Sequence, residues 1–266
     1  MRATRFTSLV LAILSIPQLT VAQQTASSST QASQLVQKSL AALQGNTSLR
    51  DVSLSGSARR IAGSDDETGT ATFKGLAVTS SRVDLSLPSG ARSEIRTVSK
   101  NCPVGSWIGP DGVSHPVANH NLSTDPGWFP AFTLASVLSA QNVVVTEIGT
   151  ETRNGQSVIH LSTGLLTQGG GDVAKLAQHL SQTDIFLDAN TLLPSAFTFN
   201  THPDSNAFLD LPIEIRFSDY RSVNGIQIPF RLQKFLNNSL LLDLQFQTAV
   251  LNTGLSSADF SVGAAL

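Results

Sequence analysis

Residues 213–246 read IEIRFSDYRSVNGIQIPFRLQKFLNNSLLLDLQF, and the fold class follows from the pattern of this stretch. Apolar side chains alternate with polar ones along three segments, which two turn signals, Asn224-Gly225 and Asn237-Asn238, separate. A period of two is typical of antiparallel strands that bury one face. The stretch therefore predicts three consecutive strands joined by tight hairpins. The alternating apolar residues are Ile213, Ile215 and Phe217, then Ile226, Ile228, Phe230 and Leu232, then Leu240, Leu242, Leu244 and Phe246.

The same alternation continues upstream, so the strands belong to a larger sheet. It returns around residues 52–54, 83–87 and 197–199. Turn signals stand between these segments at 88–90, 154–155 and 188–190. The sequence contains no internal repeat of fixed period. We therefore expect one large antiparallel sheet in a single domain.

Three segments have helical patterns instead. Residues 32–43 place Leu35, Val36, Leu40 and Leu43 at helical spacing. Residues 130–140, PAFTLASVLSA, are apolar nearly all round, and residues 172–180, DVAKLAQHL, begin at Asp172, a candidate N-cap. The predicted fold class is α+β and mainly antiparallel β. The sheet is strongly bent, with an N-terminal helix and one or two inserted helices on its concave face.

The N-terminus has the pattern of an export signal. A positive start is followed by the apolar run Leu9–Leu14 and by small residues up to Ala22. This predicts a Sec-type signal peptide over 1–22, cleaved near Ala22, and a periplasmic or secreted protein. Residues 23–34 are polar and of low complexity, which predicts a disordered linker before a single domain over 35–266. We expect no transmembrane segment in the mature chain, because the apolar run is too short.

Composition excludes several classes of function. Charged residues make up only 14 % of the chain, Ser and Thr supply 58 of 266 positions, and the net charge is −2. A nucleic-acid partner is not expected, since such proteins need a basic surface. The single cysteine, Cys102, excludes an intramolecular disulfide and a multi-cysteine metal site. We expect it to be a buried, inert thiol in a turn.

Catalytic signatures are absent from the sequence. It contains no G-x-S-x-G, H-E-x-x-H, C-x-x-C, phosphate-loop or dinucleotide motif, so we predict no enzyme, no cofactor and no metal. His115 and His120 flank Pro116 and leave open a metal pair or a hydrolase that uses loop histidines. We interpret His160, His179 and His202 as ordinary surface or edge histidines.

Phenylalanine is in excess, with thirteen Phe against one Tyr and two Trp. Such rings on alternating strand positions, facing an apolar helix at 130–140, can line a cavity for acyl chains. They can equally form a plain hydrophobic core, and composition alone favours the core.

The C-terminal region carries a family resemblance. Tyr220, Val223, Gly225 and Pro229 form a Y-x-x-V-x-G-x-x-x-P hairpin, and residues 251–260 form an x-N-x-x-L-x-x-x-x-F closure. Over these roughly 45 residues, and in the order of elements, the chain resembles the LolA/LolB-like periplasmic lipoprotein-carrier superfamily. The segment 101–127, rich in Pro, Gly and Asn, departs from that pattern.

The resemblance implies a half-barrel whose concave face is lidded by helices, with lipid or lipoprotein acyl chains held between. It implies no catalytic residue. The implied ligand-binding residues are Phe132, Leu134 and Leu138 on the lid, and Phe197, Phe199, Phe217, Phe230 and Phe246 on the sheet.

Two functions from different classes remain. The first is an exported protein that binds or carries an apolar ligand in the cell envelope. The second is an envelope protein–protein interaction module on the same scaffold, without lipid, which contacts another envelope protein through the 101–127 segment.

Overall fold

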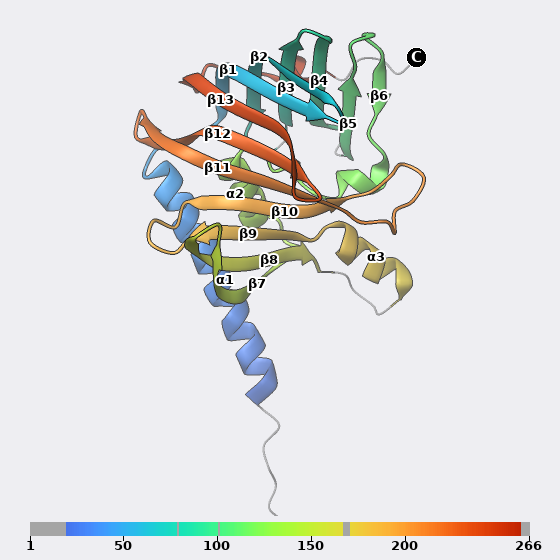
Figure 1. Ribbon diagram of the computed structural model, residues 1–266. Helices are drawn as coiled ribbons and strands as arrows, with labels where there is room; N and C mark the ends of the chain where they lie inside the picture. The colour runs from blue at the N-terminus through green and yellow to red at the C-terminus, as the bar shows by residue number, and fades with distance from the viewer. Residues whose placement is uncertain (1–19, 79, 101, 167–170, 262–266) are drawn as a thin grey trace, which may run out of the picture.

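The computed structural model describes residues 20–78, 80–100, 102–166 and 171–261, with the backbone alone for residues 20–29. Within these ranges thirteen strands form one antiparallel sheet (Figure 1). The first six are β1 (Asp51–Ala62), β2 (Asp65–Leu76), β3 (Ser80–Leu87), β4 (Gly90–Ser99), β5 (Cys102–Ile108) and β6 (Ser114–Pro116). The other seven are β7 (Val143–Arg153), β8 (Gln156–Leu165), β9 (Thr183–Asp188), β10 (Pro194–Thr201), β11 (Leu211–Val223), β12 (Ile226–Leu236) and β13 (Ser239–Leu251).

The sheet consists of two meanders joined at one pair of strands. The order in space is β6-β5-β4-β3-β2-β1-β13-β12-β11-β10-β9-β8-β7, so β1 and β13 form the junction. Across it, Ala58 of β1 lies opposite Leu244, with a bulge between Ser55 and Gly56. A Cβ atom at Gly56 would collide with the backbone of Gln245, which explains the glycine at the bulge.

The hairpins predicted from the sequence are confirmed. The stretch 213–246 forms β11, β12 and β13. Asn224 and Gly225 have φ values of 50° and 84°, and Asn237 and Asn238 have 48° and 63°. Two successive positive φ values are what a tight type I′ hairpin requires. The turns at 88–90, 154–155 and 188–190 also lie between paired strands.

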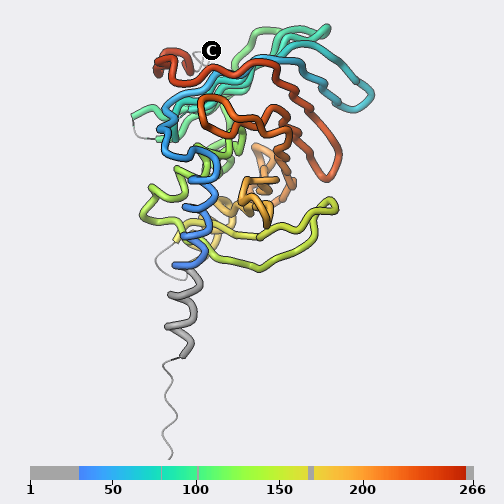
Figure 2. Tube along the Cα trace, turned by 90° about the vertical axis from the view of Figure 1, so that its left-hand side faces the viewer, coloured from blue at the N-terminus to red at the C-terminus, as the bar shows by residue number. Residues whose placement is uncertain are grey.

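Helices α1 (Thr20–Gln44) and α2 (Pro130–Ser139) lie at the concave side of the sheet. In Figure 2 the sheet curves from the first meander at the top to β7 and β8 at the bottom, and α1 and α2 lie across its open side. Helix α1 contacts α2, β7 and β12. The two outermost strands, β6 and β7, do not pair with each other, so the sheet is an open half-barrel as predicted.

The predicted N-terminal helix is confirmed, but it is longer than expected. Ala32, Val36, Ser39 and Leu43 form its buried stripe. The backbone is helical from Thr20, through the range 23–34 that we predicted as a disordered linker. Glutamine and alanine in that range favour helix, and Ala32 already belongs to the core. Most of the predicted signal peptide, residues 1–19, lies outside the described residues.

The concave interior is a continuous apolar core. It joins α1 and α2 to strands of both meanders and includes most of the alternating residues of β11 to β13. A small second cluster of Val158, Phe186 and Ala196 lies apart from it. The guanidinium of Arg153 covers Phe186 at 4.1 Å from the ring centroid.

A hydrogen-bonded clasp fastens the end of β13 to the start of β1. The buried carboxylate of Asp51 accepts bonds from the backbone N–H groups of Thr253 (2.7 Å) and Gly254 (3.0 Å) and from the Thr253 hydroxyl (3.0 Å). Asn252 accepts a bond from the Arg50 N–H at 2.8 Å. Phe260, in the short 3-10 helix η2 (Ser257–Phe260), is fully buried. The closing motif is therefore a structural fastening.

The segment 101–127 is more ordered than its composition predicts. It contains β5, β6 and the 3-10 helix η1 (Asn119–Leu122). Cys102 begins β5 and is exposed, so the prediction of a buried thiol in a turn is wrong. Its strand, β5, lies next to the edge strand β6, near the outer end of the first meander.

The second inserted helix, α3 (Asp172–Leu180), has the predicted bounds. Its N-cap is Gly171, and Asp172 lies in the first turn without a side-chain capping bond. The expectation that Asp172 caps the helix is therefore wrong. Of the helices in the described ranges, none is both long and apolar enough to cross a membrane.

Candidate ligand pocket on the concave face

The eight residues predicted to bind ligand all lie in or against the apolar core. Phe132, Leu134 and Leu138 are on α2, Phe197 and Phe199 on β10, and Phe217, Phe230 and Phe246 on β11, β12 and β13. Six of them are buried, whereas Leu138 and Phe199 are half-buried at its margin. Their rings pack on one another, for example Phe197 on Phe217 at 5.0 Å between centroids. The structure brings these residues together as a packed core, and their contact with a ligand stays a prediction.

Helix α2 approaches the sheet closely. The ring of Phe132 lies over Gly75 of β2, where a Cβ atom would come within 2.8 Å of it. Phe129, which immediately precedes α2, stacks on Phe73 at 5.8 Å and contacts Phe132 at 4.9 Å. The first half of α2 is therefore packed closely against the first meander.

A cavity of about 190 Å³ remains beside Trp128, between the first meander and β12 and β13. We call it the Trp128 pocket. Alternation on β3 turns Val83 and Leu85 toward it, and Trp128 arrives from the segment that precedes α2. Its lining comprises Val83, Leu85, Arg92, Ser93, Glu94, Trp107, Ile108, Trp128, Lys234 and Leu242.

An ion pair crosses the Trp128 pocket. Lys234 Nζ lies 3.3 Å from Glu94 Oε2 and 4.8 Å from the centroid of the Trp128 ring. The Trp128 indole N–H donates to Glu94 Oε1 at 3.2 Å. Burial raises the pKa of Glu94, but the charges of Lys234 and Arg96 and the two hydrogen bonds outweigh it and hold the pKa below 4.5. Glu94 is therefore an anion at neutral pH.

Arg92 supplies a further positive charge to the wall of this pocket. One of its terminal nitrogens donates to Ser89 at 3.1 Å, while its buried Nε has no hydrogen-bond partner among the described residues. The charges of Arg92, Lys234 and Glu94 together give the wall of the pocket a net charge of +1. Apolar walls with one surplus cation suit an acyl chain that ends in an anionic group.

Two smaller cavities flank the segment that leads into α2. One, of about 60 Å³, lies on the other side of Trp128 and includes Phe73, Phe132 and Asp125. The other, of about 110 Å³, lies toward β8 and also includes Asp125. Asp125 accepts bonds from the Gly127 N–H at 2.7 Å and from the Thr133 hydroxyl at 2.9 Å. The segment 125–133 thus separates three cavities.

The histidines considered as a metal pair have separate surroundings. The ring of His115 stacks on Trp107 at 4.0 Å, whereas His120 Nε2 lies 3.1 Å from the Pro203 carbonyl oxygen. The structure instead brings together His179, His202 and Asp210, which the sequence did not single out.

Sequence reasoning missed the polar wall of the Trp128 pocket. Glu94 and Lys234 are 140 residues apart, and only the curvature of the sheet brings them together. A polar residue on the apolar face of a strand is a weak signal that could have drawn attention to Lys234.

Comparisons with known proteins agree on the fold. No family model matches the sequence, and no curated protein matches it. A solved domain from Vibrio parahaemolyticus, described as an outer membrane lipoprotein-sorting protein, has a TM-score of 0.56 at 12 % identity and covers 87 % of this chain and 97 % of its own. A DUF1329 family protein from Desulfovibrio piger has 0.57 at 11 % identity, over 90 % and 99 % of the two chains. A LolA superfamily protein from Nitrosomonas europaea has 0.54 at 10 % identity, over 86 % and 97 %.

At such identities the likeness concerns the fold alone. It confirms the half-barrel that the resemblance to the LolA superfamily implies.

Proposed function

We propose that this chain is an exported protein that binds or carries an acyl-chain ligand in the cell envelope, and that this ligand is an anionic amphiphile such as a fatty acid. Its acyl chain enters the Trp128 pocket, and its anionic group pairs with Arg92 and Lys234. The observation that carries the proposal is an apolar cavity on the concave face whose wall has one surplus positive charge. The likeness to the Vibrio domain, which is described as lipoprotein-sorting, supports an acyl-chain ligand.

The size of the pocket sets a condition on binding. Sites for small molecules usually measure about 300–1,000 Å³, and the Trp128 pocket alone is smaller, at about 190 Å³. The three cavities of about 190, 60 and 110 Å³ add up to about 360 Å³, which reaches that range. Binding of a full acyl chain therefore requires the segment 125–133 to shift and join them.

Binding can be measured through the protein's own tryptophans. The chain has two, Trp107 and Trp128, and both line the pocket. We expect a fatty acid to change their fluorescence saturably. Leu85→Trp, which fills the cavity, should weaken binding by at least about tenfold. Leu241→Trp is the matched control, because Leu241 is an equally half-buried leucine outside the pocket.

The anionic group is tested with ligand pairs of equal chain length. The wild type should prefer a fatty acid to the fatty alcohol, and Arg92→Gln with Lys234→Gln should remove that preference. Arg59→Gln, at an exposed arginine, should leave it intact. The proposal fails if protein purified from its own host carries no extractable lipid and the stripped protein binds no acyl ligand.

A second function is favoured by the packed interior and by exposed side chains on the 101–127 segment. Trp107 is 47 % exposed and Val113 37 % exposed, and the lone thiol of Cys102 is nearby on β5. In this alternative the segment contacts another envelope protein. A photo-crosslinker on Cys102 tests it: one dominant adduct that Val113→Lys abolishes supports the contact, and no specific adduct contradicts it.

Export is also part of the proposal. We expect N-terminal sequencing of the mature protein to begin near Gln23, after cleavage at Ala22. A mature protein that retains Met1 would contradict it.

A further inference from the structure

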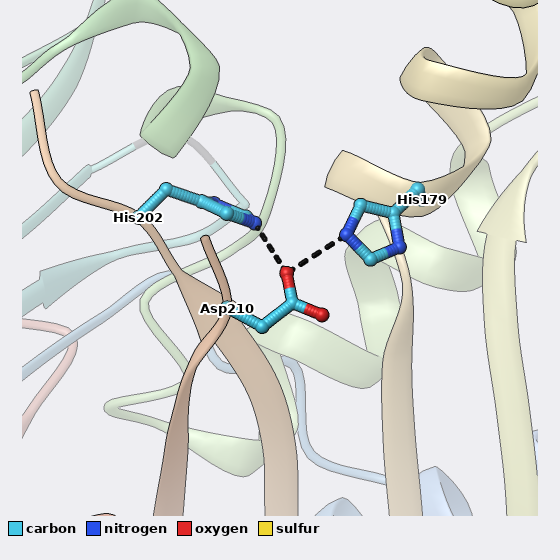
Figure 3. Close-up of side chains that lie close together, drawn as sticks. All are labelled: His179, His202 and Asp210. Carbon is cyan, nitrogen blue, oxygen red and sulfur yellow. Dashed lines mark hydrogen bonds and ion pairs between the residues drawn. The ribbon is translucent and has the colours of Figure 1, made fainter. Parts of the chain in front are cut away.

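Three side chains of ligand type meet at the side of the molecule where α3 approaches the sheet. His179 is in the last turn of α3, His202 follows β10, and Asp210 precedes β11 (Figure 3). Asp210 Oδ1 lies 2.9 Å from His179 Nε2 and 3.0 Å from His202 Nε2. One atom from each of the three side chains lies within 4.8 Å of the other two.

His202 is the buried member of the group, with a side chain only 1 % exposed. Asn121 binds the backbone of His202 through two hydrogen bonds. The Asn121 amide donates to the His202 carbonyl at 2.8 Å, and Asn121 Oδ1 accepts from the His202 backbone N–H at 2.8 Å. These two bonds fix which atom of the amide is the oxygen. That oxygen lies 3.4 Å from His202 Nδ1.

Both ring nitrogens of His202 therefore face an oxygen that accepts hydrogen bonds. A neutral imidazole has only one N–H. If Nδ1–H points to Asn121, the lone pair of Nε2 points at the carboxylate of Asp210. Two lone pairs at 3.0 Å repel unless a proton or a metal ion lies between them. The same oxygen faces a second imidazole, His179, at 2.9 Å.

We propose that His179, His202 and Asp210 bind one divalent transition-metal ion of the zinc class. Two imidazole nitrogens and one carboxylate oxygen form a donor set that zinc accepts, with a fourth position for solvent. A tetrahedral ion with bonds of about 2.0–2.1 Å holds neighbouring ligand atoms about 3.3 Å apart. The observed nitrogen–oxygen distances need to widen by a few tenths of an ångström, and the two imidazole nitrogens, which lie within 4.8 Å of each other, need to come to about the same 3.3 Å separation. His179 and Asp210 are partly exposed, which allows that movement and leaves a path for the ion.

The outer contacts fit the same assignment. The Nδ1 contact with Asn121 fits the tautomer that offers Nε2 to a metal, and such partners tune metal affinity. His120 is not a ligand in this arrangement. Its Nε2 contacts the Pro203 carbonyl and its ring meets His202 edge to face at 5.9 Å, so it supports the segment that carries His202.

The ion would attach α3 to the sheet. Leu180 is the buried residue of this helix, and Val173 at its start is 83 % exposed. A metal held by one residue of α3 and two from the β10–β11 connection joins segments that otherwise share little apolar contact. This inference does not depend on acyl binding.

The experiment uses the full mature protein without an affinity tag, stripped with chelator and dialysed against Zn²⁺ or Co²⁺ at pH 8. That pH is chosen because metal ligands must be deprotonated. We expect one ion per chain by elemental analysis, and a visible Co²⁺ spectrum typical of four-coordination. His179→Ala, His202→Ala and Asp210→Asn should each weaken binding by more than about tenfold.

His115→Ala is the matched control, since His115 stacks on Trp107 away from the cluster and should bind metal as the wild type does. If His202→Ala fails to fold, the partly exposed His179 still gives a test. The inference is overturned if the wild type takes up no stoichiometric metal. It is equally overturned if His179→Ala binds as tightly as His115→Ala.

Discussion

Asp51 shows how one carboxylate can fasten the start of β1 to the end of β13. It is buried, and the three groups that donate to it belong to Thr253 and Gly254, about 200 residues along the chain. Asp51→Ala leaves two backbone N–H groups without their acceptor. We expect the free energy of unfolding to fall by about 2–3 kcal/mol in urea titrations.

The matched control for this change is Asp65→Ala, at an exposed aspartate where β2 begins. It should leave the urea midpoint close to the wild-type value. Equal losses in the two variants would mean that the clasp contributes nothing specific.

Glu214 makes stability depend on pH. Its side chain is 8 % exposed and pairs with Arg153 and Arg216, each at 2.8 Å. Burial raises its pKa, but the two guanidinium groups outweigh it and hold the pKa below 4.5. A depressed pKa stabilises the fold above pH 4.5, and that contribution disappears as the pH falls through the folded-state value.

Glu214→Gln should therefore lower the free energy of unfolding by about 2 kcal/mol at pH 7. The difference from the wild type should shrink as the pH falls below 4.5. Urea titrations at a series of pH values measure it, with Asp66→Asn in an exposed pair as a control without measurable effect. A difference that stays constant down to pH 3 would exclude the linkage.

Among the elements, the segment before α2 determines how much of the interior is accessible. Trp128 is buried and borders both the pocket named after it and the small cavity beside Phe132. Trp128→Ala should join the two. We expect tighter binding of long acyl chains, together with a loss of about 3 kcal/mol in the free energy of unfolding.

Trp107→Ala, at the partly exposed tryptophan, should destabilise the protein less. Each variant loses one of the two tryptophans on which the fluorescence measurement depends. Acyl binding is therefore followed by calorimetry. Unchanged affinity in a destabilised Trp128→Ala protein would show that Trp128 is only a core residue.

Local pattern was enough to predict the three helices and six of the thirteen strands in the described residues, namely β1, β3 and β10 to β13. Alternation along β11 to β13 and the Asn-Gly turn at 224–225 are local signals, and the structure keeps them. β5 and β6 were missed because Pro103, Pro110 and Gly112 interrupt their pattern. Both strands are stabilised by pairing, of β5 with β4 and of β6 with β5, which is not a property of the local sequence.

The candidate sites were harder to predict than the fold. The Trp128 pocket exists because the sheet bends and brings β3 to β5 close to β12 and β13. No short segment of sequence encodes the approach of strands so far apart in the chain. His179, His202 and Asp210 come from a helix, a strand end and a loop, so their spacing follows no ligand motif. Five of the six phenylalanines that the resemblance implies as ligand-binding residues are buried, but alternation can neither decide which face of a strand points inward nor distinguish a packed core from a cavity wall.

For the whole molecule, the order of strands predicts a gradient of stability. β1, β13 and β12 lie in the middle of the sheet, while β6 and β7 form its edges. In hydrogen exchange followed by mass spectrometry, amides of the central strands should exchange at least about 100-fold more slowly than those of β6. Equal rates across the sheet would contradict this gradient.

The junction of β1 and β13 also fixes the time at which the sheet can be completed. Apart from β6 and β7, which form the two edges, every other strand pairs with its neighbours in the sequence, but β1 emerges early and must wait for the last strand of the chain. Until β13 arrives, β1 presents an open edge that can template pairing with another chain. A chain cut short before Ser239 keeps that edge permanently, so loss of the C-terminus would produce aggregation and not merely a smaller protein.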